Sequence, residues 1–246
     1  MKQPCVRESG IGYRGKTIKI FHLPSSLSLI ALCLYTLSSL SAQQLRVGLT
    51  GGLVTSQVDG DTWSGYNKAG LLGGGFVAKR FPARSAGGSA ESKWSVSFEI
   101  CYILKGSRKN PHPDKGDFTS YKLNLNYAEV PLLLKYDFGI PDSSVNGRLK
   151  FSLEGGIAVG ALVHSYEEDS YGQLTGGTPF QKSDVSTILG LCYHLSKHIG
   201  FNVRTEYSIV PVRKGGTSPY FQNWTYKFLK PGYYNNLLTF SFRYQF

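Results

Sequence analysis

Apolar and polar side chains alternate with a two-residue period along most of the chain after residue 44. The clearest segment is Trp94–Leu104, WSVSFEICYIL, in which every even-numbered residue is apolar or aromatic and most odd-numbered residues are polar. Such alternation is typical of a β-strand that has one apolar face. No long segment shows the 3.6-residue apolar period of an amphipathic helix. The sequence therefore predicts an all-β protein.

Seven further segments show the same alternation, which gives eight predicted strands. They are Leu45–Val54, Ala69–Phe81, Tyr121–Phe138, Leu149–Val163, Val185–Leu195, Phe201–Ile209 and Leu238–Phe246. Within Tyr121–Phe138, the apolar residues are odd-numbered up to Tyr127 and even-numbered from Val130 onward. An extra residue in a strand reverses the facing, and proline is tolerated at such a site. We therefore predict a β-bulge around Ala128–Glu129, next to Pro131.

The segments between the predicted strands alternate between long and short. The long polar ones are Thr55–Lys68, Lys105–Ser120, His164–Ser183 and Val210–Tyr234, and the shorter ones are Pro82–Lys93, Gly139–Gly147 and Ser196–Gly200. Long loops on one side and short turns on the other are typical of outer-membrane barrels. An even number of strands places both termini on the short-turn, periplasmic side. The prediction is an eight-stranded antiparallel up-and-down transmembrane β-barrel.

Charged residues lie near the middle of several strands, on the polar face. They are Glu99, Lys150, Glu154, Arg204, Glu206 and Arg243. Burying a charge costs several kcal/mol unless it is paired, and an eight-stranded barrel has a lumen just wide enough for packed side chains. We therefore predict that these residues form an internal network of ion pairs and hydrogen bonds. A proton or ion path through the lumen is the alternative.

The opposite face is apolar, with aromatic residues near the strand ends. These are Trp94, Tyr102, Tyr136, Tyr193, Tyr244 and Phe246. Aromatic rings settle at the headgroup level of membranes, which favours a face directed at lipid. A β-sandwich with one solvated face is the alternative.

The first 42 residues have the features of an export signal. Lys16 and Lys19 precede the uncharged segment SSLSLIALCLYTLSSL at residues 25–40, and the small residues Ser41 and Ala42 follow it. This order is typical of a cleaved secretory signal peptide. We predict a signal peptide at residues 1–42 and a barrel domain at residues 43–246. A lipid anchor on Cys33 is the alternative, but the large Leu32 precedes it.

Two cysteines, Cys101 and Cys192, remain after residue 42. Both occupy lumen-facing positions, on the third and sixth predicted strands. Strands so placed in a barrel are too far apart for the distance of about 7 Å that a disulfide tolerates between Cα atoms. We predict two buried free thiols.

Several segments resemble a known family. The quoted segments are GLTGGLV near the start, NLNYAEVPLLLKYDF at Asn124–Phe138, LEGGIAVGALV at Leu153–Val163, LGLCYHLSKHIGFNVRTEYS at Leu189–Ser208 and the terminal LLTFSFRYQF. Over about residues 45–246 the chain resembles the PorT-like outer-membrane β-barrel family, also called the porin family. The resemblance implies an outer-membrane location in a Gram-negative bacterium. It also implies that Phe240, Phe242, Tyr244 and Phe246 form the C-terminal signal read by the barrel-assembly machinery. Some relatives take part in protein secretion or gliding, and the family name does not establish a pore.

Basic residues gather in two of the long loops. They are Arg108, Lys109 and Lys115 in one loop and Arg213 and Lys214 in the other. Lys and Arg side chains bind phosphate strongly, so these residues are candidates for contacts with lipopolysaccharide. Solvated loop charge is the alternative. The formal net charge is +11, but no compact basic run interleaved with aromatic residues occurs, so we predict no nucleic-acid partner.

No GxSxG, HExxH or Walker motif occurs, and His164, His194 and His198 lack metal-ligand spacing. We therefore predict no catalytic, metal or cofactor site. The predicted function is a structural, binding or secretion-accessory role through the extracellular loops, with an extracellular or secretion-system protein as one partner. The alternatives are a narrow channel for small solutes, a soluble periplasmic ligand-binding barrel, and an acyltransferase that pairs His164 or His194 with a loop serine.

Overall fold

The computed structural model describes residues 45–61, 63, 65–82, 92–142, 148–215 and 232–246. The predicted signal peptide and much of the loop Val210–Tyr234 lie outside these residues. The long strands are β1 (Leu45–Asp59), β2 (Lys68–Arg80), β3 (Trp94–Lys109), β4 (Tyr121–Asp142), β5 (Arg148–Asp169), β7 (Ser183–His194), β8 (Ile199–Ser208) and β10 (Gly232–Gln245). The short elements are the 3-10 turn η2 (Pro113–Lys115) and the strands β6 (Gly172–Gln173) and β9 (Arg213–Lys214).

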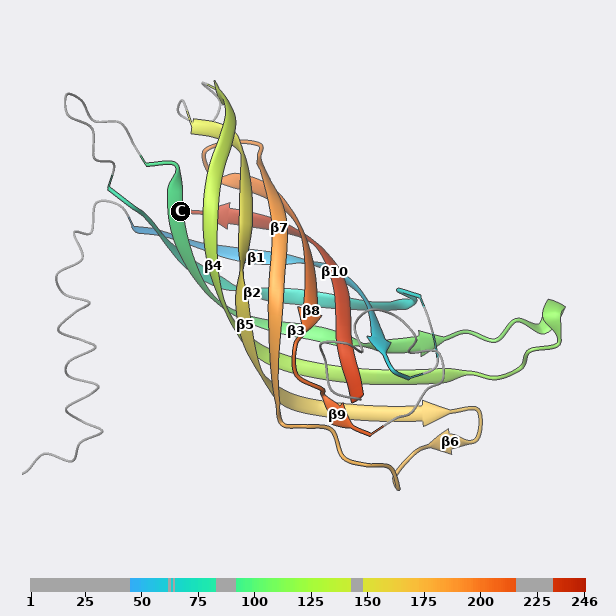
Figure 1. Ribbon diagram of the computed structural model, residues 1–246. Helices are drawn as coiled ribbons and strands as arrows, with labels where there is room; N and C mark the ends of the chain where they lie inside the picture. Colours follow the sequence, from blue (N-terminus) through green and yellow to red (C-terminus); the bar gives the residue numbers. More distant parts are fainter. Residues whose placement is uncertain (1–44, 62, 64, 83–91, 143–147, 216–231) are drawn as a thin grey trace, which may run out of the picture. The chain divides into compact units, whose positions relative to one another are not determined.

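The eight long strands close into a ring (Figure 1). Each one pairs antiparallel with the next long strand along the chain, and β10 pairs back with β1, from Gly48 opposite Gln245 to Asp59 opposite Tyr234. A closed ring has no free sheet edge, which is what a sheet surrounded by lipid requires. The predicted eight-stranded antiparallel barrel is confirmed. The first residue of β1, Leu45, and the last of β10, Gln245, lie at the same end of the barrel, which we name the terminal end; the opposite end is the loop end.

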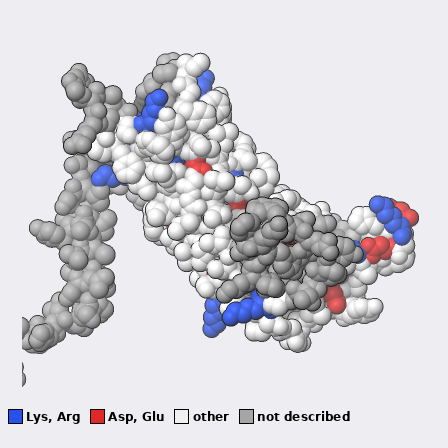
Figure 2. All heavy atoms as spheres, in the orientation of Figure 1, with Lys and Arg blue, Asp and Glu red and all other residues white. Residues whose placement is uncertain are grey.

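The outer face of the ring is apolar along its middle. Leu53, Ile100 and Leu189 point outward and keep 62%, 61% and 64% of their surface exposed. By contrast, Ser97, which lies on the inward face of the same strand as Ile100, is fully buried. Charged side chains are few on the middle of the face shown in Figure 2. A contiguous apolar surface of this kind requires lipid or a partner against it. Among the described residues, no helix is long and apolar enough to cross a membrane.

Strand β4 does not change parity, and the bulge predicted at Ala128–Glu129 is wrong. Every odd-numbered residue from Leu123 to Asp137 is buried. The register against β5 does shift at two other places. One shift lies between Asn126 and Tyr127, where the additional residue is Val163 of β5, and the other lies between Phe138 and Pro141. The sequence pattern was misleading because the apolar side chains in the first half of β4 pack inside the barrel and not against lipid.

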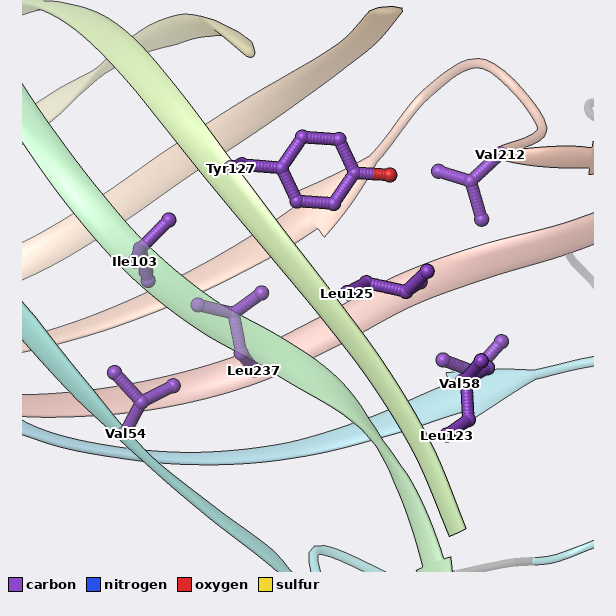
Figure 3. Packing of buried hydrophobic residues seen from close by; sticks show 8 residues of the cluster. All are labelled: Val54, Val58, Ile103, Leu123, Leu125, Tyr127, Val212 and Leu237. Carbon is purple, nitrogen blue, oxygen red and sulfur yellow. The ribbon is translucent and has the colours of Figure 1, made fainter. Parts of the chain in front are cut away.

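Those inward side chains belong to a hydrophobic cluster at the loop end, which we name the plug (Figure 3). Its members are Val54, Val58, Ile103, Leu123, Leu125, Tyr127, Val212 and Leu237, and none is more than 1% exposed. They come from β1, β3, β4, β10 and the segment after β8. Burial to this degree means that they contact one another and not water, so the plug closes the lumen at this level.

Several strands extend beyond the predicted segments. β4 and β5 each have 22 residues, whereas about 9–11 tilted residues are enough to cross a membrane. β3 continues to Lys109 and β5 to Asp169, so parts of two predicted loops are strand. At the loop end, β3, β4 and β5 form a sheet that continues past the other strands (Figure 1). We name its outermost segments Arg108–Lys109, Tyr121–Lys122 and Glu167–Asp169 the projection.

Candidate functional site

Five charged side chains meet in the middle of the lumen, and we name them the central network. They are Glu99 of β3, Lys135 of β4, Glu154 of β5, Arg204 of β8 and Arg243 of β10, all on the buried face of their strands. Arg204 joins the two carboxylates, with Nη1 2.8 Å from Glu99 Oε2 and Nε 2.5 Å from Glu154 Oε1. Lys135 Nζ lies 2.9 Å from Glu154 Oε2, and Arg243 Nη1 lies 2.5 Å from Glu99 Oε1.

The central network depends on a glycine for space. A Cβ atom on Gly190 of β7 would lie 2.7 Å from Arg204 Cγ and 3.0 Å from Glu154 Oε1. Both distances are too short for a side chain in a packed interior. Glycine at this position therefore lets the Arg204 side chain run along β7 to reach the carboxylates. The Asn202 amide also donates to Glu154 Oε1 at 2.5 Å.

A second group of buried charges lies between the central network and the plug, and we name it the upper network. Lys105 of β3 contacts Glu129 of β4, and its Nζ lies 2.6 Å from Glu206 Oε1 and 3.5 Å from Asp184 Oδ2. The hydroxyl of Ser186 donates to Glu206 Oε1 at 2.6 Å. Three carboxyl groups surround one ammonium here, so this level of the lumen is rich in hydrogen-bond acceptors.

Near the terminal end, four polar residues form a chain of contacts. Arg80 contacts Asp137, the Ser152 hydroxyl donates to Asp137 Oδ1 at 2.7 Å, and Ser152 Oγ lies 2.6 Å from His194 Nε2. A carboxylate only accepts hydrogen bonds and a hydroxyl has one proton. If Ser152 gives its proton to Asp137, His194 Nε2 must donate to Ser152. That direction is the opposite of the one that activates a serine nucleophile.

The loop end carries a set of aromatic and charged contacts above the plug. The Tyr121 hydroxyl donates to Glu167 Oε1 at 2.7 Å, and Arg213 Nη2 lies 2.5 Å from Glu167 Oε2. The guanidinium of Arg213 lies 3.7 Å from the ring centroid of Phe180, within the range of cation–π attraction. Lys109 Nζ lies 4.0 Å from the ring centroid of Trp63. These contacts cover the plug on the side of the loop end.

The comparisons with known proteins agree with this architecture. A family model described as "Outer membrane protein beta-barrel domain" matches residues 41–213. The chain belongs to this family.

Membership in the outer membrane protein beta-barrel domain family places the ring in the outer membrane, with lipid against its apolar outer face. Short turns in such barrels are periplasmic and long loops extracellular, so the terminal end faces the periplasm. A comparison with curated protein sequences finds no match.

Three solved structures show a weaker likeness to this chain. The attachment invasion locus protein Ail of Yersinia pestis is 12% identical, with 83% of this chain and 100% of that chain covered and a TM-score of 0.42. Neisserial surface protein A is 13% identical, with coverage of 81% and 97% and a TM-score of 0.42. OprG from Pseudomonas aeruginosa is 15% identical, with coverage of 82% and 96% and a TM-score of 0.36. At these levels the likeness carries no inference about a ligand or partner.

The structure brings together most of the charges that the sequence predicted for the lumen. Glu99, Glu154, Arg204 and Arg243 lie in the central network, and Glu206 lies in the upper network. Lys150 lies on the same face of β5, four residues nearer the terminal end than Glu154, and is half-buried.

Four members of the central and upper networks were missed by the sequence analysis. They are Lys105, Glu129, Lys135 and Asp184. Lys105 falls in a predicted loop, and the assumed parity change in β4 obscured Glu129 and Lys135. If Leu123 to Asp137 is taken as one uninterrupted strand, all its odd-numbered residues share a face. That interpretation would have placed Glu129 and Lys135 in the lumen.

The five predicted anion contacts fall into two groups. Lys109 pairs with Asp117 at 2.8 Å and Arg213 pairs with Glu167, so both are already engaged with carboxylates. The other three, Arg108, Lys115 and Lys214, are exposed. Arg108 lies directly opposite Lys122 across β3 and β4.

The remaining predicted positions are placed as follows. Phe240, Phe242 and Tyr244 point outward on β10, and the Phe246 ring lies 5.5 Å from that of Tyr244. Cys101 and Cys192 are buried and free, as predicted. No group of three or more His, Cys, Asp or Glu side chains within the described ranges is arranged to hold a metal ion.

We expect that replacing Arg204 with Met will destabilise the barrel strongly, because Glu99 and Glu154 would lose the cation that joins them. The loss of one partner from a buried ion pair costs about 3–5 kcal/mol. Chemical unfolding of the refolded barrel in lipid vesicles measures the change. Arg204→Lys should recover only part of the loss, because an ammonium cannot bridge two carboxylates as a guanidinium does. The control is Lys115→Met at the exposed hairpin, and an equal effect of both variants would contradict the role of the network.

A pH dependence is expected from Asp61, at the extracellular end of β1. Burial is the main cause that raises the pKa of this carboxyl to about 6, although the Trp63 backbone N–H donates to Asp61 Oδ1 at 2.9 Å. The folded state therefore holds the Asp61 proton to a higher pH than the unfolded state. Consequently the free energy of unfolding falls as pH rises from about 4 to 6, by at most about 3 kcal/mol for a two-unit difference.

Asp61→Asn removes this ionisation while retaining an oxygen acceptor. The variant should have a higher free energy of unfolding than the wild type at pH 7.5 and nearly the same value at pH 4. Denaturant unfolding at the two pH values gives the comparison. A difference that does not change with pH would show that burial of Asp61 imposes no penalty on the charged form.

Proposed function

We propose that this protein is a closed, non-conducting barrel of the outer membrane that acts as a binding protein through its extracellular projection. The observation that carries the proposal is the filled lumen beneath a projecting sheet. The plug, the upper network and the central network occupy successive levels of the lumen. Passage of a solute through the lumen is therefore closed, and β3, β4 and β5 extend beyond the other strands that the structure describes.

The projection has a surface suited to anionic lipopolysaccharide. Arg108 and Lys122 are both exposed and lie directly opposite each other, an arrangement that is unfavourable for like charges. Glu168 of β5 lies opposite Lys122 on its other side, so the two cations have one carboxylate on this face. Lys68 lies close by, and burial, followed by the charges of Lys122 and Arg108, lowers the pKa of the Lys68 ammonium. An external phosphate group would relieve this repulsion. We infer that these three cations contact lipopolysaccharide phosphates.

The proposal has three further parts. The chain belongs to the PorT-like branch of the family, it is exported by a cleaved signal peptide at residues 1–42, and it is assembled through its C-terminal residues. They are supported by the sequence resemblance and by the outward aromatic side chains of β10. A protein partner of a secretion system is consistent with the length of the projection. A narrow solute channel is disfavoured by the plug, and a soluble periplasmic barrel by the apolar outer face.

The closed lumen predicts unequal reactivity of the two cysteines of the mature chain. Cys192 borders the terminal end, whereas Cys101 lies opposite Glu129 and only two residues from Glu99, between the two networks. In barrels refolded in vesicles, a water-soluble maleimide should modify Cys192 slowly and Cys101 only after unfolding. Single-cysteine variants, Cys101→Ser and Cys192→Ser, separate the two signals in mass spectra. Rapid modification of Cys101, or stepwise conductance in planar bilayers, would support a channel instead.

The lipopolysaccharide contact is tested by unfolding in vesicles with and without lipopolysaccharide. Lipopolysaccharide should raise the free energy of unfolding of the wild type, and Arg108→Gln with Lys122→Gln should reduce that rise by about 1 kcal/mol per charge. The matched control, Lys93→Gln with Lys182→Gln, removes the same charge at two exposed positions outside the predicted loop contacts. An equal reduction in both double variants would indicate attraction by net charge without a specific contact.

A further inference from the structure

A pocket opens at the periplasmic, terminal end of the lumen, and its lining is strongly basic. Among the lining residues are Arg46, Lys135, Asp137, His194, Lys197 and Arg243. Four of these side chains are cationic and one is a carboxylate, and that carboxylate already contacts Arg80 and accepts a hydrogen bond from Ser152. The pocket therefore carries an excess of positive charge.

The inner part of the pocket is formed by members of the central network. Lys135 and Arg243 are 8% and 6% exposed, so both cations are held in a buried position and face the pocket. The central network as a whole has three cations and two carboxylates, Glu99 and Glu154. Its carboxylates thus leave one positive charge without a counterpart inside the network. The excess carboxylates of the upper network lie on the other side of the central network, toward the plug. On the pocket side, where Lys135 and Arg243 lie, the imbalance favours an anion within reach.

Two buried hydroxyls flank Arg243. Thr50 is its cross-strand neighbour on β1, and Ser241 precedes it by two residues on the same face of β10. The hydroxyl oxygens of Thr50 and Ser241 have no hydrogen-bond partner within the part of the chain that the structure describes. Buried polar groups normally have partners. Neither residue lines the pocket, so these hydroxyls make the surroundings of Arg243 polar and are not direct contacts for a ligand in the pocket.

We propose that this pocket binds a phosphate-type oxyanion that enters from the periplasm. Arginine and lysine donors match the charge and the several acceptor oxygens of phosphate. A carboxylate ligand would supply one negative charge, whereas phosphate near neutral pH supplies up to two. The same chemistry occurs in a free phosphate ester and in a phospholipid headgroup, so the two sources need separate probes. This binding site is independent of the extracellular function proposed above.

The first experiment measures binding of inorganic phosphate to the refolded mature chain in a neutral maltoside detergent, by calorimetry at constant ionic strength. Acetate is the matched anion of lower charge. Phosphate should bind and acetate should bind at least about tenfold more weakly. Equal affinities for phosphate and acetate would overturn the proposal.

Variants at the rim test the site without disturbing the central network. Arg46→Gln with Lys197→Gln removes two charges from the pocket, and Lys115→Gln with Lys214→Gln removes two charges at the opposite end of the barrel. The rim variant should bind phosphate about tenfold more weakly, and the control variant should retain wild-type affinity. The faster gel migration of unboiled samples verifies that each variant is folded. Equal losses in both variants would show long-range attraction only and would overturn the site.

A second titration, with soluble short-chain phosphatidic acid, whose headgroup is a phosphate monoester, distinguishes the sources. Tighter binding of this lipid than of inorganic phosphate, weakened by the same rim variant, would assign a headgroup as the ligand. Tighter binding of inorganic phosphate would assign a small soluble phosphate, free or as a monoester, as the ligand. Absence of binding by both probes would overturn the proposal and would leave the extracellular function unaffected, because that function is tested by cysteine modification and lipopolysaccharide.

Discussion

Pairing of buried charge is the constraint on which the rest of this structure depends. A sheet surrounded by lipid must turn its charged side chains toward the lumen, and an eight-stranded lumen is too narrow to hydrate them fully. Arg204 resolves this problem by bonding to Glu99 and Glu154 at once. These contacts join β8 to β3 and β5, strands that are not its neighbours in the ring. The paired charges therefore replace the missing water and also connect the barrel wall across its interior.

The lumen is organised in levels, and each level has its own chemistry. Above the paired charges, Leu123, Leu125 and Tyr127 replace polar side chains on the same face of β4 and form part of the plug. The change occurs where β4 leaves the apolar belt and its outer face becomes polar, as Lys122 shows. Beyond the membrane the sheet has its apolar face inside and its polar face outside, as in a soluble protein. In β4 the same residues by parity face inward throughout. The inward face is apolar up to Tyr127 and carries charged residues from Glu129 onward, so the strand suits both environments without a change of facing.

This exchange explains what could be predicted from the sequence and what could not. The two-residue period identifies which residues share a face, so Glu99, Glu154, Arg204 and Arg243 could be assigned to the lumen from alternation alone. The period does not say what each face meets. The apolar residues in the first half of β4 were therefore expected to face lipid, although they pack in the plug, and Lys105 was expected in a loop. The contacts across the lumen depend on the stagger between non-neighbouring strands, about which local alternation carries no information.

The two ends of the barrel differ in a way that follows from the same charges. At the extracellular end the cations Lys109 and Arg213 are neutralised by Asp117 and Glu167, and aromatic rings cover them. At the periplasmic end Lys135 and Arg243 belong to a network that has fewer carboxylates than cations, and they border an open pocket. A barrel that needed these cations only for stability could balance them with one more acidic residue. The upper network has such residues, with three carboxylates around the single ammonium of Lys105. The imbalance at the open end is therefore better explained by a ligand that brings its own negative charge than by the requirements of folding.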